Sequence, residues 1–213
     1  MLNNYELNKI FNSKLIKSLL VGLSSTTLIA VAHAESTNCA APIVEAYKSA
    51  SPENAVKSLI GAPLNNCQLL TEDNELHKAK STKQSLKVFR YVESDWGLNK
   101  ERKDGPELCS IMHNLNICFY KEPSKQGLPS VMYVHDFPYN KGDNLGVLFS
   151  NGVIVQYDYG PIVKGDLAML APPEITGLMM SSSLPVAVVH GGEADIILPP
   201  LSESMKKDFL NAK

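Results

Sequence analysis

Apolar residues recur along this 213-residue chain with two different periods. Between residues 39 and 67 they return at helical spacing, as in "APIVEAYKSA" and "SPENAVKSLIG". From residue 86 onward they alternate as in strands, beginning with "LKVFRYVESDW". The pattern predicts a short helical segment followed by a mainly β domain, an antiparallel β-sandwich.

Two helices are predicted in the helical segment. Ile43 and Tyr47 lie on the apolar side of the first helix. Ser51 is placed to cap the second helix, and Gly61 suits the position just past its end. Residues 71–85, "TEDNELHKAKSTKQS", contain almost no apolar side chains and are predicted to form a solvated linker.

The stretch "LGVLFSNGVIVQYDYG", residues 145–160, predicts a hairpin around its Asn-Gly pair, a two-residue turn signal. In that register Phe149 faces Ile154 on one side, and Leu148 faces Val155 on the other. Both faces are then apolar near the turn, which fits a hairpin covered on both sides or one with an interface on one side. We expect burial of both faces, because an exposed apolar strand promotes aggregation.

Further strands are predicted in "ELCSIMHNLNICFYKE", as a hairpin turning at residues 113–116, and in "SVMYVHDF", "LPVAVVHG" and "ADIILPP". The stretch "ITGLMMSSS" fits either a helix or a strand. The tail "LSESMKKDFLNAK" predicts a short helix with Ser202 at its N-cap and Phe209 among its apolar contacts.

The first 34 residues have the features of a Sec signal peptide. Lys9, Lys14 and Lys17 give a basic start, an apolar stretch follows, and Ala-His-Ala precedes Glu35 as a cleavage site. The apolar run is shorter than the roughly 20 residues that a membrane span needs. We therefore expect cleavage, with no integral membrane span in the mature protein.

The sequence is accordingly divided into four parts: a signal peptide (1–34), a helical hairpin segment (35–70), a polar linker (71–85) and a β-sandwich domain with a short C-terminal helix (86–213). Cleavage leaves 179 residues, of which 17 are basic and 21 acidic, a formal charge of −4. This balance argues against a nucleic-acid partner, which requires a basic surface.

All four cysteines follow the predicted cleavage site, and an even number in an exported chain indicates two disulfides. Of the three possible pairings we expect Cys39–Cys67, which brackets the helical hairpin, and Cys109–Cys118, which flanks a β-turn. The chain has no Cys-x-x-Cys or His-x-x-x-His spacing. The sequence therefore predicts no metal site, no redox centre and no cofactor.

No catalytic constellation is predicted. His190 and the two glycines after it are similar to a lipase oxyanion loop, but the chain has no Gly-x-Ser-x-Gly nucleophile. His135 is followed by an aspartate, yet no nucleophile is marked beside it. Asp158, Asp166 and Glu174 lack the spacing of a calcium loop.

Aromatic residues are the best candidates for a binding surface, because tyrosine combines a large contact area with a polar group. Ordinary strand packing is the alternative explanation for them. The candidates are Tyr133, Phe137, Tyr139, Tyr157 and Tyr159.

Three stretches resemble the invasion-associated locus B family of exported bacterial proteins: "DWGLNKERKDGPELCSI", with Trp96 and Cys109, the "LGVLxxNG" segment, and "IILPPLSESMKKDFLNA". The chain departs from the family at Lys100, near an expected cysteine, and in "ITGLMMSSSLP", which lacks a cysteine pair. The family's disulfides are therefore not carried over. The resemblance implies a periplasmic or surface β-sandwich involved in host-cell association.

Two functions are open. The first is a non-catalytic binding or host-association protein of the bacterial envelope, a virulence protein whose partner is another envelope or host protein. The second is a periplasmic hydrolase of unrecognised type, which requires His135 or His190 in a cleft with a carboxylate and a hydroxyl. We expect the first function, in the periplasm or at the cell surface.

Overall fold

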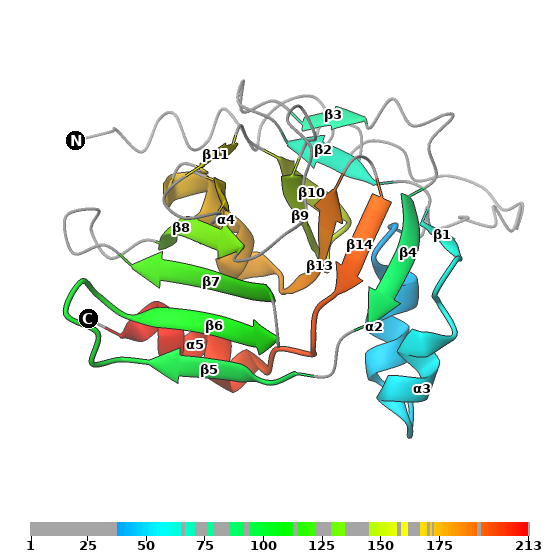
Figure 1. Ribbon diagram of the computed structural model, residues 1–213, viewed down its shortest axis with the longest axis horizontal. Coiled ribbons are helices and arrows are strands. Elements are labelled where there is room, and N and C mark those ends of the chain that lie inside the picture. Colours follow the sequence, from blue (N-terminus) through cyan, green and yellow to red (C-terminus); the bar gives the residue numbers. More distant parts are fainter. Residues whose placement is uncertain are drawn as a thin grey trace, which may run out of the picture. The chain divides into compact units, whose positions relative to one another are not determined.

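A computed structural model of the chain is shown in Figure 1. It describes residues 38–64, 67–70, 76–78, 86–91, 94–112, 115–121, 129–134, 145–156, 159–161, 167–169, 171, 173–190 and 193–212. The predicted signal peptide lies outside the described residues, so its cleavage stays a prediction. None of the helices in the described part has the length and apolar character that a membrane span requires.

The described residues form two β-sheets accompanied by short helices, which confirms the mainly β prediction. One sheet contains β1 (Pro63–Leu64), β2 (Gln68–Leu70), β3 (Leu76–Lys78), β4 (Leu86–Tyr91), β9 (Leu145–Phe149), β10 (Val153–Gln156), β13 (Pro185–His190) and β14 (Glu193–Ile197), in the order β1-β4-β14-β13-β9-β10-β2-β3. The other contains β5 (Trp96–Asn99), β6 (Glu107–Met112), β7 (Leu115–Lys121), β8 (Pro129–Val134), β11 (Tyr159–Pro161) and β12 (Leu167–Met169), in the order β11-β12-β8-β7-β6-β5. The helices are α2 (Ala41–Tyr47), α3 (Pro52–Lys57), α4 (Pro173–Ser182) and α5 (Glu203–Asn211).

The eight-stranded sheet is mixed, so the prediction of a purely antiparallel fold is wrong for this sheet. β2 runs parallel to β10, and β4 runs parallel to β14. Each of these pairs joins an early strand to one that follows much later in the chain. Parallel neighbours need a long crossover connection, and alternation within a single strand does not reveal its neighbour.

The predicted polar linker contains a strand. β3 lies within residues 71–85 and pairs antiparallel with β2 at one edge of the eight-stranded sheet. An edge strand is held largely by backbone hydrogen bonds on one side, so it needs few apolar residues. Residues 63–78 therefore contribute strands to the same sheet as the later part of the chain.

The two N-terminal helices are present, but α3 ends at Lys57, earlier than predicted. Ser51 occupies the N-cap position without a side-chain bond to the helix backbone; its hydroxyl instead accepts from Asn54 Nδ2 at 2.9 Å. Gly61 has a left-handed φ of 84° but lies beyond the helix end. Its N–H donates to the Val88 carbonyl at 2.7 Å, so it directs the chain into β1 beside β4.

Two hydrophobic clusters lie on opposite faces of the central β9–β10 hairpin. The larger cluster unites both sheets with α4 and α5, and its members are Leu70, Trp96, Leu108, Ile117, Phe119, Leu145, Val147, Phe149, Val153, Val155, Ala171, Met179, Met180, Val188, Ile196, Leu198, Leu201 and Phe209. The smaller cluster unites the N-terminal helices with the eight-stranded sheet, and its members are Cys39, Ala40, Ile43, Ala46, Val56, Leu64, Cys67, Val88, Leu148, Ile154, Val186, Ala187, Val189 and Ile197. Every residue of β9 is buried, which confirms that both faces of the hairpin are covered.

The register of this hairpin differs from the prediction by one residue. Leu148 pairs with Ile154 rather than with Val155, so residues 150–152 form a three-residue loop. The glycine that ends the loop has a φ of 82°, and its N–H donates to the Phe149 carbonyl at 2.9 Å. Because a one-residue shift exchanges the faces, Phe149 and Val155 share the larger cluster, whereas Leu148 and Ile154 belong to the smaller one.

The C-terminal part is helical at both places where the sequence allowed it. "ITGLMMSSS" lies in α4 except for its last serine, Ser183. α5 begins after Ser202, whose hydroxyl accepts from the Met205 N–H at 3.2 Å, as predicted for an N-cap. Figure 1 shows α5, in red, running along β5 and β6, and the fully buried ring of Phe209 fixes the helix to the larger cluster.

Candidate functional site

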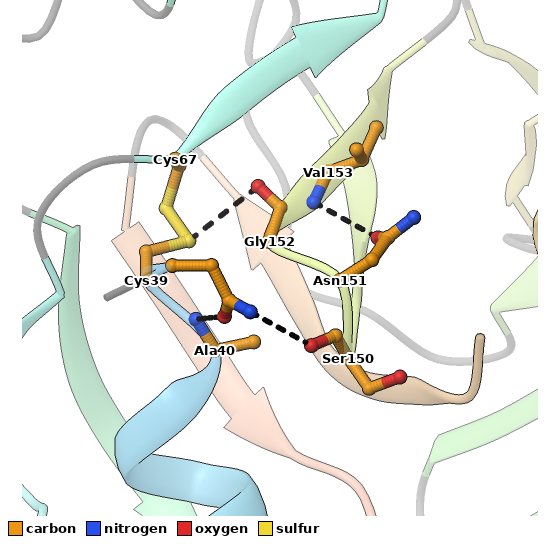
Figure 2. Close-up of a disulfide and its surroundings, with 8 residues drawn as sticks. Cys39, Ala40, Cys67, Ser150, Asn151, Gly152 and Val153 are labelled. Atoms are coloured by element: carbon orange, nitrogen blue, oxygen red, sulfur yellow. Dashed lines mark hydrogen bonds between the residues drawn. A yellow bond between two sulfur atoms is a disulfide. The ribbon is translucent and has the colours of Figure 1, made fainter. Parts of the chain in front are cut away.

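The Cys39–Cys67 disulfide lies beside the loop of the central hairpin, as Figure 2 shows, and confirms the first predicted pairing. Its cysteines are 2% and 7% exposed. The Cys39 Sγ atom is 3.7 Å from the Gly152 carbonyl oxygen, which also accepts from the Gln68 N–H at 2.9 Å. The disulfide thus joins the start of α2, the approach to β2 and the hairpin loop at one point.

Asn38 connects the same loop to the start of α2. Its amide nitrogen donates to the Ser150 carbonyl at 3.3 Å, and its amide oxygen accepts from the Ala40 N–H at 2.9 Å. A Cβ atom at Gly152 would lie 2.6 Å from Asn38 Cβ. Glycine is therefore required here both by its positive φ and by the close approach of Asn38.

The second predicted disulfide, Cys109–Cys118, is also present and joins directly paired residues of β6 and β7. The carboxylate of Glu107 and these two sulfurs lie within 4.8 Å of one another. Metal binding by cysteine requires a thiolate, and both sulfurs are consumed by the disulfide. This group therefore holds the strands together rather than a metal ion.

A charged and aromatic group lies next to this disulfide. The Arg102 guanidinium lies over the Tyr120 ring, 4.2 Å from its centroid, and its Nη1 atom is 3.4 Å from Glu107 Oε1. Both partners attract the guanidinium, the Tyr120 ring through its electron-rich face and Glu107 through its negative charge. The Arg102 side chain is 32% exposed, so the group reaches the surface.

A pocket of about 430 Å³ lies between the end of α4 and one side of α5. Its lining residues are Ser181, Glu203, Ser204, Lys206, Lys207, Leu210 and Asn211. The Lys206 side chain is only 8% exposed, and its Nζ lies 2.7 Å from the carboxylate of Glu203. The hydroxyl, amide and ammonium groups can bind a small polar molecule, but Glu203 already neutralises the buried charge.

Lys121 is a buried side chain that the sequence analysis did not single out. Its Nζ donates to the Leu210 carbonyl at 2.8 Å and to the Ala212 carbonyl, so it satisfies the C-terminal end of α5. Burial lowers the pKa of Lys121. Lys121 is the last residue of β7 and is followed in the sequence by Glu122, so nothing nearby marks it as buried, and its partners lie 89 and 91 residues further along the chain.

The predicted binding residues fall partly within the described chain. Phe137, Tyr139 and Tyr157 lie outside the described residues. Tyr133 belongs to β8 and occupies the same ladder row as Ala168, whereas Tyr159 belongs to β11 and occupies the adjacent row, opposite Met169. The fold brings these two tyrosines to one sheet but not to one row.

Two of the other candidates for chemistry lie within the described residues. The backbone of His190 lies at the end of β13, where it pairs with residues 145 and 193. Glu174 is exposed in the first turn of α4. His135, Asp158 and Asp166 lie outside the described residues.

No known family model matches the chain, and neither a curated protein nor a solved structure is significantly similar to it. The resemblance to the invasion-associated locus B family therefore stays a prediction from three short stretches of sequence.

Proposed function

We propose that this chain is an exported protein of the bacterial envelope that acts by binding, in the manner implied by its resemblance to the invasion-associated locus B family. The observation that carries this proposal is the pair of disulfides. Disulfides persist in the periplasm and outside the cell, and they are rare in the reducing cytosol. The predicted signal peptide supports the same compartment.

We also infer that the two sheets pack as a sandwich. The support is the larger hydrophobic cluster, in which Trp96 and Phe119 of the six-stranded sheet join Val147 and Phe149 of the eight-stranded sheet. Trp96 and Phe119 have ring centroids 6.3 Å apart. Packing of two sheets across such a layer gives a rigid scaffold from which loops can bind a partner.

Export is tested on protein isolated from the envelope of its own cells. N-terminal sequencing is expected to begin at Glu35, and alkylation without reduction is expected to label none of the four cysteines. Protein that keeps Met1, or that labels with the alkylating reagent, would contradict export.

Binding is tested with the oxidised protein on host cells and on isolated envelopes. Saturable binding is expected to weaken in Tyr133→Ala or in Tyr159→Ala, but not in both, because adjacent ladder rows alternate between the two faces of a sheet. Ile60→Ala is the matched control, since Ile60 is 47% exposed and outside the candidate surface. Binding that is lost instead in His135→Ala or His190→Ala, together with a hydrolytic activity, would favour the enzyme alternative.

A further inference from the structure

The two disulfides differ in what they connect. Cys109 and Cys118 are 9 residues apart in adjacent strands that already share backbone hydrogen bonds. Cys39 and Cys67 are 28 residues apart, and the loop that they close contains α2, α3 and β1. We call residues 38–64 the N-terminal segment. A disulfide constrains the unfolded chain more when it closes a longer loop. The Cys39–Cys67 disulfide is therefore expected to contribute more to stability than the Cys109–Cys118 disulfide.

The N-terminal segment has little stability of its own. α2 has seven residues and α3 has six, and isolated helices of this length are unstable in water. β1 is a two-residue strand at the edge of the eight-stranded sheet. The order of the segment therefore depends on its contacts with the rest of the protein.

Those contacts consist of one apolar face, the backbone pairing of β1 with β4 and a few side-chain hydrogen bonds. Ile43, Ala46 and Val56 pack in the smaller cluster. The Tyr47 hydroxyl donates to the Leu198 carbonyl, and the Asn38 amide donates to a carbonyl of the hairpin loop. The larger cluster contains no residue of the N-terminal segment. The core that unites both sheets is thus complete without this segment.

We propose that the Cys39–Cys67 disulfide is a redox switch that controls whether the N-terminal segment is docked on the eight-stranded sheet. A dithiol reduces it by two electrons: the S–S bond breaks, each sulfur takes up a proton, and the dithiol becomes a disulfide. The segment then leaves the sheet while the larger cluster stays folded. Its departure exposes apolar side chains of the smaller cluster that lie outside the segment, among them Leu148, Ile154, Ala187 and Val189. This inference holds whether or not the proposed binding function is correct.

Burial of the two cysteines links reduction to movement of the segment. With Cys39 and Cys67 at 2% and 7% exposure, an attacking thiolate reaches neither sulfur while the segment is docked. Local opening must come first, after which attack can proceed. Once the bond is broken, the loop-closure entropy favours the open form.

The test compares three oxidised proteins: the wild type, Cys39→Ala/Cys67→Ala, and the matched control Cys109→Ala/Cys118→Ala. Each is treated briefly with trypsin, and mass spectrometry measures cleavage after Lys48 and Lys57 in the N-terminal segment. Fluorescence of Trp96, the one tryptophan in the chain and a member of the larger cluster, reports whether that core stays folded. If the first double variant does not fold, wild-type protein partly reduced with dithiothreitol replaces it, with the reduced pair identified by alkylation.

Cleavage after both lysines is expected to be at least about tenfold faster without the first disulfide, as local opening becomes more populated. In the control variant the rate is expected to stay within about twofold of the wild type, with native Trp96 emission in all three proteins. Equal cleavage rates in the three proteins would overturn the proposal, because the disulfide would then not control docking. Loss of native Trp96 emission together with rapid cleavage would also overturn it, because the segment would then not be released separately.

Discussion

The central hairpin is buried on two sides by two different clusters, and truncation of one residue on each side tests this arrangement. Phe149 is 2% exposed in the larger cluster, and Leu148 is fully buried in the smaller one. Phe→Ala in a core costs about 3–5 kcal/mol, and Leu→Ala about 2–5 kcal/mol, because a cavity is added to the loss of apolar burial. The larger cluster joins two sheets and two helices, so it can collapse little around a cavity. The loss of unfolding free energy in Phe149→Ala is therefore expected at the upper end of its range, about 4–5 kcal/mol.

Leu148 faces the short helices of residues 38–57, which can shift toward a cavity more easily than a sheet can. Leu148→Ala is therefore expected at the lower end of its range, about 2–3 kcal/mol. The exposed Ile60→Ala serves as a control and is expected to change stability by about 0.5 kcal/mol or less. Urea denaturation of the oxidised proteins, followed by Trp96 fluorescence and circular dichroism, measures the change in unfolding free energy of all three variants. A loss below about 1 kcal/mol for Leu148→Ala would refute the packing of the N-terminal helices on this face.

Gly152→Ala is expected to cost clearly more than Gly61→Ala, although both residues have positive φ. In both variants the left-handed conformation costs about 1–2 kcal/mol of stability. Only the new Cβ at position 152 also meets Asn38, at 2.6 Å, whereas the space around Gly61 is open. Equal melting temperatures for the two variants would contradict the close approach. Burial lowers the pKa of Lys121 below its ordinary value of 10.5, so between the two pKa values the unfolded chain binds a proton that the folded chain does not. The free energy of unfolding of the wild type, relative to that of Lys121→Met, is therefore expected to rise with pH up to about 10.5. Urea denaturation midpoints of both proteins, measured over this pH range, test this. Parallel pH profiles would show that the pKa of Lys121 is the same in the folded and unfolded chains.

Local patterns predicted many of the strands correctly, because alternation acts over short distances, but the turn predicted at residues 113–116 is wrong, since β7 already begins at Leu115. The β6–β7 hairpin, the strands β13 and β14 and the cap of α5 at Ser202 all follow from neighbouring residues. The parallel pairing of β2 with β10 and of β4 with β14 does not follow from neighbouring residues, since it depends on which distant strand has a free edge. Many strands of the two sheets were therefore predictable, but β1, β2 and β3 were not, and neither was the order of the strands within each sheet.

The register error has a similar cause. The Asn-Gly pair is compatible with a two-residue or a three-residue loop, and local sequence does not choose between them. In the structure the Ser150 hydroxyl accepts from the Leu184 N–H at 2.9 Å, and the Ser150 N–H donates to the Leu184 carbonyl at 2.7 Å. Asn151 Oδ1 accepts from the Val153 N–H at 3.1 Å. The contacts to Leu184, just before β13, hold Ser150 in the loop rather than in the ladder with β10.

Both disulfide pairings were predictable from the sequence, but the structural surroundings of only one disulfide were. Cys109 and Cys118 bracket a turn, and their setting is the hairpin itself. The position of Cys39 against the central hairpin was not predictable, because Asn38 beside it bonds to Ser150, 112 residues away. That contact places a covalent bond where the N-terminal helices meet the loop of the central hairpin. Under the proposed redox switch, formation of the Cys39–Cys67 disulfide and coverage of the second face of this hairpin are coupled, so the chain is expected to reach its fully covered form only in a compartment that oxidises thiols.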